Sequence, residues 1–310
     1  MSRALVFPGQ GAQTIGMGKA LAEAYPAAEA VFEEVDAALG ESLSSLIWEG
    51  DIETLTLTQN AQPALMATSM AAMRALEAEG FGVGDATYVA GHSLGEYSAL
   101  AAAGSLSVAD AARLLRTRGQ AMQEAVPVGV GAMAAVLGLD LDAVRAVAEE
   151  AAGEEVCEAA NDNDPAQVVV SGHLGAVERA VEIAKSKGAK RAVMLPVSAP
   201  FHCALMAPAA TVMADALAGV EIAAPKVPVV ANVVASPVDD PEIIRDLLVK
   251  QVTGAVRWRE SVQMMVGAGV DAFWEVGAGK ALAGMIRRIE RSAATKAVGT
   301  PEDVAALKSA

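Results

Sequence analysis

The sequence predicts an α/β fold in which a small ferredoxin-like unit is inserted into a larger domain with a mostly parallel sheet. The 310 residues are 53% hydrophobic but only 4% aromatic, a mixture that favours a helix-rich α/β protein over a β-sandwich. A short apolar stretch, a glycine-flanked turn and a run of helix formers follow one another at 87–103. A β-α-β-β-α-β series between 131 and 197 is typical of a ferredoxin-like unit.

The larger domain begins with short apolar strands that alternate with helices. Strands are predicted at 3–7 and 87–90. Helical spacing of apolar residues predicts helices over 17–39, with a break at Tyr25-Pro26, and over 60–79, 96–103 and 109–125. This alternation predicts a parallel sheet with helices packed on it.

The inserted unit and the return to the larger domain follow. Strands are predicted at 133–139, 156–160, 167–171 and 191–197, and helices at 140–152 and 174–187. We therefore expect one domain made of residues 1–127 and 198–310, and a second one at 128–197. Beyond the insertion, strands are expected at 227–233 and 271–276 and helices near 206, at 241–252, at 258–266 and ending at 287–288. The tail 308–310 is expected to be frayed.

Composition excludes several classes of protein. A net charge of −15 argues against general nucleic-acid binding, which depends on a positive field towards phosphate. The two cysteines, Cys157 and Cys203, form no C-x-x-C or His/Cys cluster, so neither a disulfide framework nor a zinc site is predicted. The apolar run 125–139 is too short and too interrupted to span a membrane, and no signal segment precedes the first strand. We expect a cytoplasmic protein.

The stretch Gly91-His92-Ser93-Leu94-Gly95 has the G-x-S-x-G pattern of a nucleophile elbow. In such an elbow, small residues on either side let strand and helix approach closely, and the serine oxygen stands above the sheet edge. The N–H of Leu94 would then face a developing oxyanion. The alternative is an ordinary strand-to-helix turn in which Ser93 caps the helix.

The turn after the first strand, Pro8-Gly9-Gln10-Gly11-Ala12-Gln13, is rich in glycine and amide side chains. Exposed backbone N–H groups after a parallel strand suit an anion or oxyanion site. An ordinary β-to-α loop is the simpler alternative. The chain has no G-x-G-x-x-G here, so a dinucleotide site is not predicted.

A serine hydroxyl needs a base, and the sequence offers three histidines. His92 precedes Ser93 on the strand exit and is assigned to packing or support, and His173 to the surface of the small domain. His202 follows a strand of the larger domain, where α/β sheets gather functional groups, so it is the candidate base. A buried core histidine is the alternative. No acid is obvious between Ser93 and His202, so we expect a backbone carbonyl to orient the imidazole.

An arginine near the serine would recognise a carboxylate through two parallel charge-assisted hydrogen bonds. Arg113 and Arg116 share one face of the helix at 109–125, and Arg118 lies about 160° from Arg116. One of the three arginines therefore lies on a different face of the helix from the other two. The alternative for any one of them is a solvated helix face.

Taken together, these motifs resemble the malonyl-CoA:acyl-carrier-protein transacylase family of type II fatty acid synthesis. The matching blocks occur in the family's order across nearly the whole chain: 7–13, 91–97, Arg118-Gly119, 161–172, 198–202 and 277–284. The resemblance implies a large hydrolase-like core with an inserted ferredoxin-like subdomain. The chain departs from the family's usual residues at Ala12, Ala278 and Cys203-Ala204. The resemblance therefore does not define the shape of the pocket beside His202, where Cys203 lies.

The resemblance also implies roles for individual residues. Ser93 is the acyl-accepting nucleophile and His202 its base. The amides of Gln10 and Leu94 form the oxyanion hole. Arg118 pairs with the malonyl carboxylate. Gln251 matches a glutamine whose main-chain carbonyl orients the histidine.

The implied activity is transfer of the malonyl group from malonyl-CoA to the phosphopantetheine thiol of holo acyl carrier protein, through a malonyl-serine intermediate with ping-pong kinetics. No metal or cofactor is required, because the phosphopantetheine arm belongs to the substrates, and a monomer is expected. Carrier proteins are acidic, so a basic patch is predicted, formed by Lys185, Lys187, Lys190 and Arg191 or by Arg287, Arg288 and Arg291. A serine esterase or thioesterase, and a non-catalytic scaffold that binds the carrier, remain alternatives.

Overall fold

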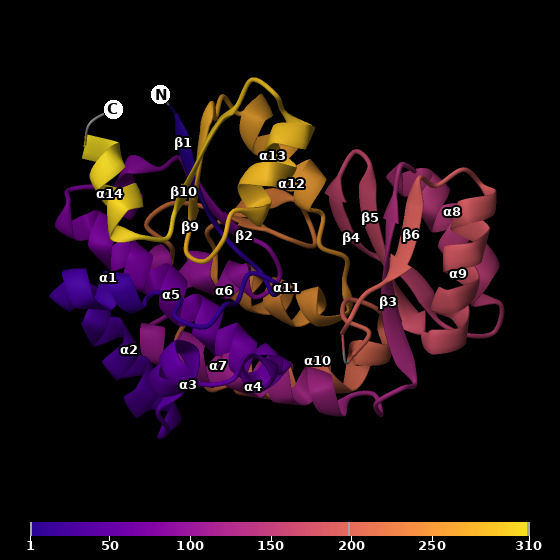
Figure 1. Ribbon diagram of the computed structural model, residues 1–310, viewed down its shortest axis with the longest axis horizontal. Helices are drawn as coiled ribbons and strands as arrows, with labels where there is room; N and C mark the ends of the chain where they lie inside the picture. The colour runs from indigo at the N-terminus through magenta and orange to yellow at the C-terminus, as the bar shows by residue number, and fades with distance from the viewer. Residues whose placement is uncertain (1, 198, 309–310) are drawn as a thin grey trace.

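The computed structural model describes residues 2–197 and 199–308, which form a large unit and a small unit, each built on its own sheet (Figure 1). The larger sheet has the order β10-β9-β1-β2-β7-β8. Its strands are β1 (Arg3–Phe7), β2 (Tyr88–Gly91), β7 (Val229–Ala231), β8 (Ser236–Val238), β9 (Ala272–Val276) and β10 (Ala294–Val298). All neighbours pair in parallel except β7 and β8, so the predicted mostly parallel sheet is confirmed.

The first strand shows why this sheet carries helices on both faces. Successive side chains of a strand point to opposite faces. Leu5 and Phe7 belong to one buried hydrophobic cluster, and Ala4 and Val6 belong to another on the opposite face. A strand that is apolar at every position therefore needs cover on both sides.

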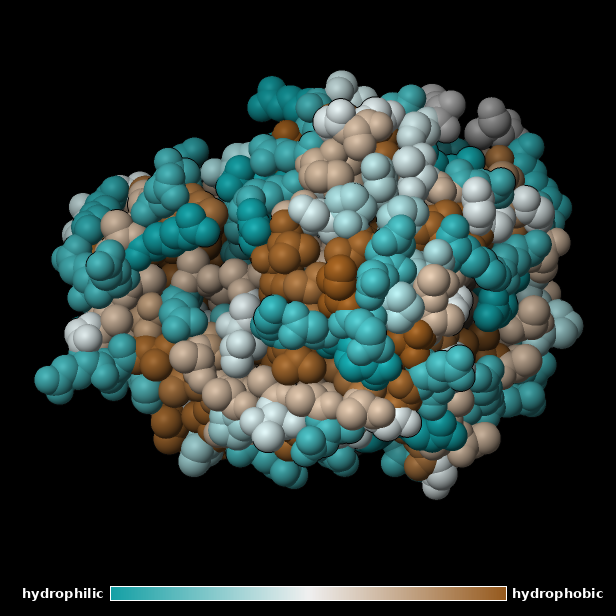
Figure 2. Space-filling model, turned by 180° about the vertical axis from the view of Figure 1, so that it is seen from behind, coloured by the Kyte–Doolittle hydropathy of each residue, from teal (hydrophilic) through white to brown (hydrophobic). Residues whose placement is uncertain are grey.

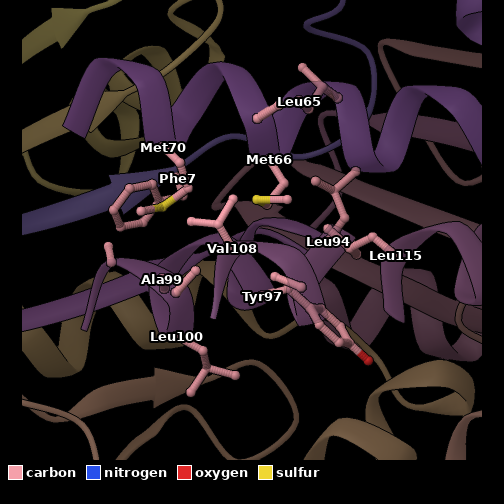
Figure 3. Close-up of a cluster of buried hydrophobic side chains, with 14 of the residues drawn as sticks. Phe7, Leu65, Met66, Met70, Leu94, Tyr97, Ala99, Leu100, Val108 and Leu115 are labelled. Carbon is pink, nitrogen blue, oxygen red and sulfur yellow. The ribbon is translucent and has the colours of Figure 1, made fainter. Parts of the chain in front are cut away.

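The cluster around Leu5 and Phe7 is built mainly from helices early in the chain: α1 (Lys19–Ala24), α2 (Pro26–Leu39), α3 (Leu43–Glu49), α4 (Ile52–Thr56), α5 (Thr58–Ala78), α6 (Gly95–Ala102) and α7 (Val108–Glu124). The helices α10 (Ala207–Ala218) and α11 (Pro241–Thr253) complete it. Figure 3 shows its centre, where Met66 and Met70 of α5 lie over Phe7, Leu94 and Val108. The opposite face is covered by α12 (Trp258–Gly267) and α13 (Ala281–Ile289).

The small unit is a four-stranded antiparallel sheet with the order β4-β5-β3-β6. Its elements are β3 (Gly131–Leu137), α8 (Leu141–Ala152), β4 (Cys157–Asp164), β5 (Gln167–His173), α9 (Leu174–Ser186) and β6 (Arg191–Met194). The first and last strands differ from the predicted ranges by up to three residues, and β4 continues four residues further. The predicted domain boundaries at 127 and 197 stay a prediction, and Ser198 lies outside the described residues.

The long strand β4 joins the small unit to the large one. Asn161 forms an isolated parallel bridge with Val256. The buried carboxylate of Asp162 pairs with Arg259 at 2.8 Å, and that of Asp164 pairs with Arg288 at 2.6 Å. A hydrogen bond between Asn163 Oδ1 and His92 Nε2 places the end of β4 beside the turn that follows β2.

Several elements differ from the sequence prediction. The helices α3 and α4, the strands β8 and β10, the helix α14 (Pro301–Lys308) and the short 3₁₀ helix Val83–Asp85 were not predicted. A second 3₁₀ helix, Ala204–Met206, leads into α10. The expected fraying at Lys308 is wrong, because this residue ends α14 and its ammonium pairs with Glu79. The last two residues lie outside the described part of the chain.

The chain as a whole is 53% hydrophobic, but many of its apolar side chains are buried. Figure 2 shows that hydrophilic residues cover most of one face, while hydrophobic residues gather near its middle. Among the described residues, no helix is both long and apolar enough to span a membrane.

Candidate active site

The turn between β2 and α6 has the geometry of a nucleophile elbow. Ser93 has a φ of 53°, a left-handed backbone conformation that residues other than glycine rarely adopt. A Cβ at Gly91 would lie 1.9 Å from the backbone of Gly95, and one at Gly95 would lie 2.3 Å from the carbonyl oxygen of Phe7. Only glycine therefore allows α6 to start this close to the sheet.

The Ser93 hydroxyl points at His202. The distance from Ser93 Oγ to His202 Nε2 is 2.8 Å. On the other side of the ring, Nδ1 donates to the carbonyl oxygens of Gln251 at 2.9 Å and Gly254 at 3.1 Å. Because both partners are acceptors, the proton sits on Nδ1 and Nε2 is free to accept the serine proton.

The imidazole of His202 is held neutral. Burial lowers its pKa to about 3, the positive charge of Arg118 acts in the same direction, and the carbonyl of Gln251 acts against them. At neutral pH the ring can therefore accept a proton. A carboxylate bound at Arg118 would offset the positive field and make the imidazole more basic when substrate is present.

The backbone amides of Gln10 and Leu94 belong to the wall of the cavity that Ser93 lines. Within the described chain, the N–H groups of Gln10 and Leu94 make no hydrogen bond, although both residues line the same cavity. The side chain of Leu94 packs in the core, so its backbone is held firmly (Figure 3). Unpaired N–H groups near a nucleophile suit a developing oxyanion.

Arg118 is 1% exposed and forms no ion pair with any described residue. Its Nη1 donates to Gln62 Oε1 at 2.7 Å, and its Nη2 donates to Gln251 Oε1 at 2.8 Å and to Ser93 Oγ at 3.1 Å. Its Nε, also buried, has no partner among the described residues. A buried guanidinium with only neutral partners can accept a substrate carboxylate.

These groups line one cavity of about 360 Å³ between the two units. The large unit contributes the residues described above, together with Met122 and Phe201. The small unit contributes Met133 and Asn161, and the segment after β6 contributes Leu195 to Val197. The cavity therefore combines apolar side chains with several polar ones, which is typical of a small-molecule site.

Of the two other histidines, one has the position that the sequence predicted and the other does not. His92 has the supporting position predicted for it: its Nε2 lies 2.8 Å from Asn163 Oδ1, and its ring lies against Trp258. His173 is not a plain surface residue, because its Nδ1 accepts the N–H of Val156 at 2.9 Å and it ends β5.

The arginine faces also separate as their spacing predicts. Arg113 donates to Asp110 and to a backbone carbonyl at the surface, and Arg116 pairs with Glu41. Only Arg118 among the three turns towards Ser93. The role of Arg118 towards a carboxylate stays a prediction.

Cys203 lies behind the site. It is fully buried, and its Sγ donates to the carbonyl of Pro200 at 3.2 Å. It is not among the residues that line the cavity.

Three supporting side chains were missed by the sequence analysis. Asn232 accepts the N–H of Ser93 at 2.8 Å, Glu96 accepts from Gln251, and Gln62 accepts from Arg118. Asn232 lies 139 residues from Ser93 and belongs to no motif, so nothing in its neighbourhood in the sequence singles it out. Glu96 did carry a signal, because an acid directly after an elbow falls in the buried first turn of α6.

The predicted basic patches are partly neutralised. Lys185 pairs with Glu182, Lys187 with Glu150 and Arg288 with Asp164. Carrier docking on either patch stays a prediction. In the ranges that the structure describes, no group of three or more His, Cys, Asp or Glu side chains could hold a metal ion.

Comparison with known proteins gives a consistent result. Residues 4–304 match the family model described as "Acyl transferase domain". A curated relative from Bacillus subtilis (strain 168), "Malonyl CoA-acyl carrier protein transacylase", is 47% identical over 302 residues, which cover 97% of this chain and 94% of the relative.

Solved structures agree. The crystal structure of an acyl-carrier-protein-S-malonyltransferase from Bartonella henselae is 56% identical, with a TM-score of 0.97, and the match covers 100% of this chain and 99% of that one. The malonyl-transacylase of a solved complex with its type II polyketide acyl-carrier protein is similar too. The match has 42% identity, a TM-score of 0.97 and 100% coverage of both chains.

Proposed function

The chain belongs to the acyl transferase domain family, and we propose that it transfers the malonyl group from malonyl-CoA to the phosphopantetheine thiol of an acyl carrier protein, which supplies extender units for fatty acid biosynthesis. The observation that carries this proposal is the contact of one hydroxyl, Ser93 Oγ, with both a neutral imidazole and a buried guanidinium that has no anionic partner among the described residues. The imidazole supports acyl transfer, and the guanidinium supports an acyl group that ends in a carboxylate.

The first half-reaction loads the enzyme. Ser93 Oγ attacks the thioester carbonyl carbon while its proton passes to His202 Nε2, and the N–H groups of Gln10 and Leu94 hold the oxyanion. When the tetrahedral species collapses, the C–S bond breaks and the departing CoA thiolate takes the proton from His202. Each oxyanion donor contributes about 3 kcal/mol, and the base about 10²- to 10⁴-fold in rate.

The second half-reaction unloads it. The carrier's phosphopantetheine thiol gives its proton to His202 and attacks the ester carbonyl of malonyl-Ser93. The C–O bond to Ser93 breaks, and His202 returns the proton to the serine oxygen. Because CoA leaves and malonyl-Ser93 forms before the carrier reacts, the kinetics are ping-pong. The same residues act in both half-reactions, and neither step uses a metal or a redox cofactor.

The ester must survive until the carrier arrives. The ester would lie in a cavity between the two units that is lined in part by Met122, Met133 and Leu195, and this enclosure limits the access of water. This favours transfer over hydrolysis and therefore the transferase over an esterase with the same elbow.

We further propose that the protein is a cytoplasmic monomer.

The test is formation and transfer of a covalent adduct. The protein is incubated with malonyl-CoA, its intact mass is measured, and the adduct is mapped by peptide sequencing. We expect one malonyl group on Ser93 that moves to holo acyl carrier protein when the carrier is added. Release of free malonate faster than this transfer would favour the esterase, and an absent adduct would favour the non-catalytic scaffold.

Two variants complete this test. Ser93→Ala should form no adduct. Ser98→Ala is the matched control, because Ser98 lies on the same helix α6, is fully buried and has no hydrogen-bond partner among the described residues. This variant should be loaded as the native protein is.

A further inference from the structure

Glu96 is a buried acid that takes no part in the mechanism above. It is 3% exposed, lies in the first turn of α6 and follows Ser93 by three residues. Its Oε2 accepts two hydrogen bonds, from the backbone N–H of Asn232 at 3.0 Å and from Gln251 Nε2 at 2.8 Å. One carboxylate oxygen therefore anchors two residues that come from distant parts of the chain.

Both anchored residues hold the backbone of the nucleophile. Asn232 Oδ1 accepts the N–H of Ser93 at 2.8 Å, and Gln251 Nε2 donates to the carbonyl oxygen of Ser93 at 3.0 Å. Asn232 Nδ2 also donates to the carbonyl of Gly91 at 2.7 Å. A serine with a φ of 53° stays in that conformation only when its surroundings impose it, and these bonds do so on both sides of the residue.

Gln251 also connects Glu96 to Arg118. Because the Nε2 group of Gln251 is engaged by Glu96 and by the carbonyl of Ser93, its Oε1 must face the other way, where it accepts from Arg118 Nη2 at 2.8 Å. A rotated amide would place N–H groups against the guanidinium, which is itself only a donor. Glu96 thus fixes which end of the amide Arg118 meets.

The anchoring does not depend on the charge of Glu96. Burial raises its pKa to about 7, while the bonds from Gln251 and Asn232 and the charge of Arg118 act against this rise. Oε2 accepts in either protonation state, because a proton on the acid can sit on Oε1. A glutamine at position 96 would therefore preserve the two acceptor bonds.

We propose that Glu96 is a positioning residue for acyl selectivity: it holds Ser93 in place through Asn232 and aims Arg118 through Gln251. The inference rests on the proposed function, because aiming Arg118 matters only for an acyl group that carries a carboxylate. It makes a separate claim about which residue sets the preference for malonyl over acetyl.

The test compares Glu96→Ala with Glu96→Gln in the first half-reaction. The rate of loading is measured by quenched-flow mass spectrometry, once with malonyl-CoA and once with acetyl-CoA. Displacement of a reacting group by 1 Å costs about 100-fold in rate, so we expect a loss of that order for malonyl loading in the alanine variant. Acetyl loading should fall less, because it depends on the position of Ser93 but not on that of Arg118. The glutamine variant should regain malonyl loading to within about fivefold of the native rate.

Two more variants separate the effect of Glu96 on Ser93, through Asn232, from its effect on Arg118, through Gln251. They also test the proposal if Glu96→Ala does not fold. Asn232→Ala should slow malonyl and acetyl loading by the same factor. Gln251→Ala keeps the main-chain carbonyl that orients His202 but removes the acceptor for Arg118, so it should slow malonyl loading more than acetyl loading. Glu275→Ala is the matched control: Glu275 is fully buried and accepts two backbone N–H groups of α13, away from the cavity. It should lower Tm without changing selectivity.

The outcomes are distinct. A folded Glu96→Ala variant with the native ratio of malonyl to acetyl loading would overturn the inference, and so would equal changes of that ratio in Asn232→Ala and Gln251→Ala. Native protein that loads malonyl on Ser93 and passes it to holo acyl carrier protein would show that the proposed function stands regardless. Native protein that forms no malonyl-Ser93 would overturn both.

Discussion

Replacement of Arg118 by alanine should convert a malonyl-selective site into one that no longer prefers malonyl over acetyl. The guanidinium is 1% exposed and has three neutral hydrogen-bond partners, so it is available to a substrate carboxylate. A hydrogen bond to a charged group contributes about 1.5–3 kcal/mol, and a bidentate pair forms two. The carboxylate must also lose its water, so we take about 3 kcal/mol as the net contribution.

At 1.4 kcal/mol per tenfold, this corresponds to a loss of about 100-fold in kcat/KM for malonyl-CoA. Acetyl transfer should be unchanged or faster, because the acetyl group has no carboxylate to bind and Ser93 Oγ loses a competing donor.

The assay measures kcat/KM for both thioesters with one carrier protein. Arg113→Ala is the matched control, since Arg113 lies on the same helix at the surface and should leave the ratio unchanged. Circular dichroism shows whether the Arg118 variant is folded. A folded variant with the native malonyl-to-acetyl ratio would refute the assignment of Arg118.

Three further predictions follow from the site and its supports. The ¹⁵N shifts of the His202 ring should stay those of a neutral imidazole from pH 8 down to about 5, because burial and the charge of Arg118 lower its pKa to about 3; a midpoint near 6.5 would contradict this. Cys203→Ser should retain malonyl transfer within about threefold in steady-state assays, because the hydroxyl can donate to the same carbonyl and the residue does not line the cavity; a larger loss would place it in the pocket wall. Arg259→Ala should lower the free energy of unfolding in urea by about 3 kcal/mol, because it leaves the carboxylate of Asp162 buried without its partner. Replacement of the exposed Arg145 by alanine should change this free energy by less than about 0.5 kcal/mol. Equal effects of the two variants would show that the buried pair stabilises the fold no more than an exposed one.

Much of the fold was predictable because its strongest signals are local. The strand β1 was predicted at its observed bounds from an unbroken apolar run, and the break between α1 and α2 from Tyr25-Pro26. The strand β10 was missed because its residues alternate between exposed and half-buried and include Lys296, as suits the edge of a sheet. The helices α3 and α4 are short, and most of their stability comes from packing on α2 and α5.

The candidate site was predictable only in part. Ser93 was found from a five-residue pattern, and His202 by comparing three histidines. The position of Gln251 came from a family resemblance, and its side chain proved to make three further hydrogen bonds that no pattern indicates. Asn232 and the anchoring role of Glu96 were missed, since a hydrogen bond between residues about 140 positions apart leaves no local trace.

The sequence by itself determined the strand, the two glycines and the serine of the elbow, because close backbone approach and a positive φ act within a few residues. Only the tertiary structure decided that Ser93 Oγ lies 2.8 Å from an imidazole 109 residues away and that Arg118 has no anionic partner among the described residues. Such distances follow from the order of strands in the sheet and from the packing of α7 and α11 against α6. Chain segments that are far apart are brought together by burial of their apolar faces, and this burial has no preferred sequence separation.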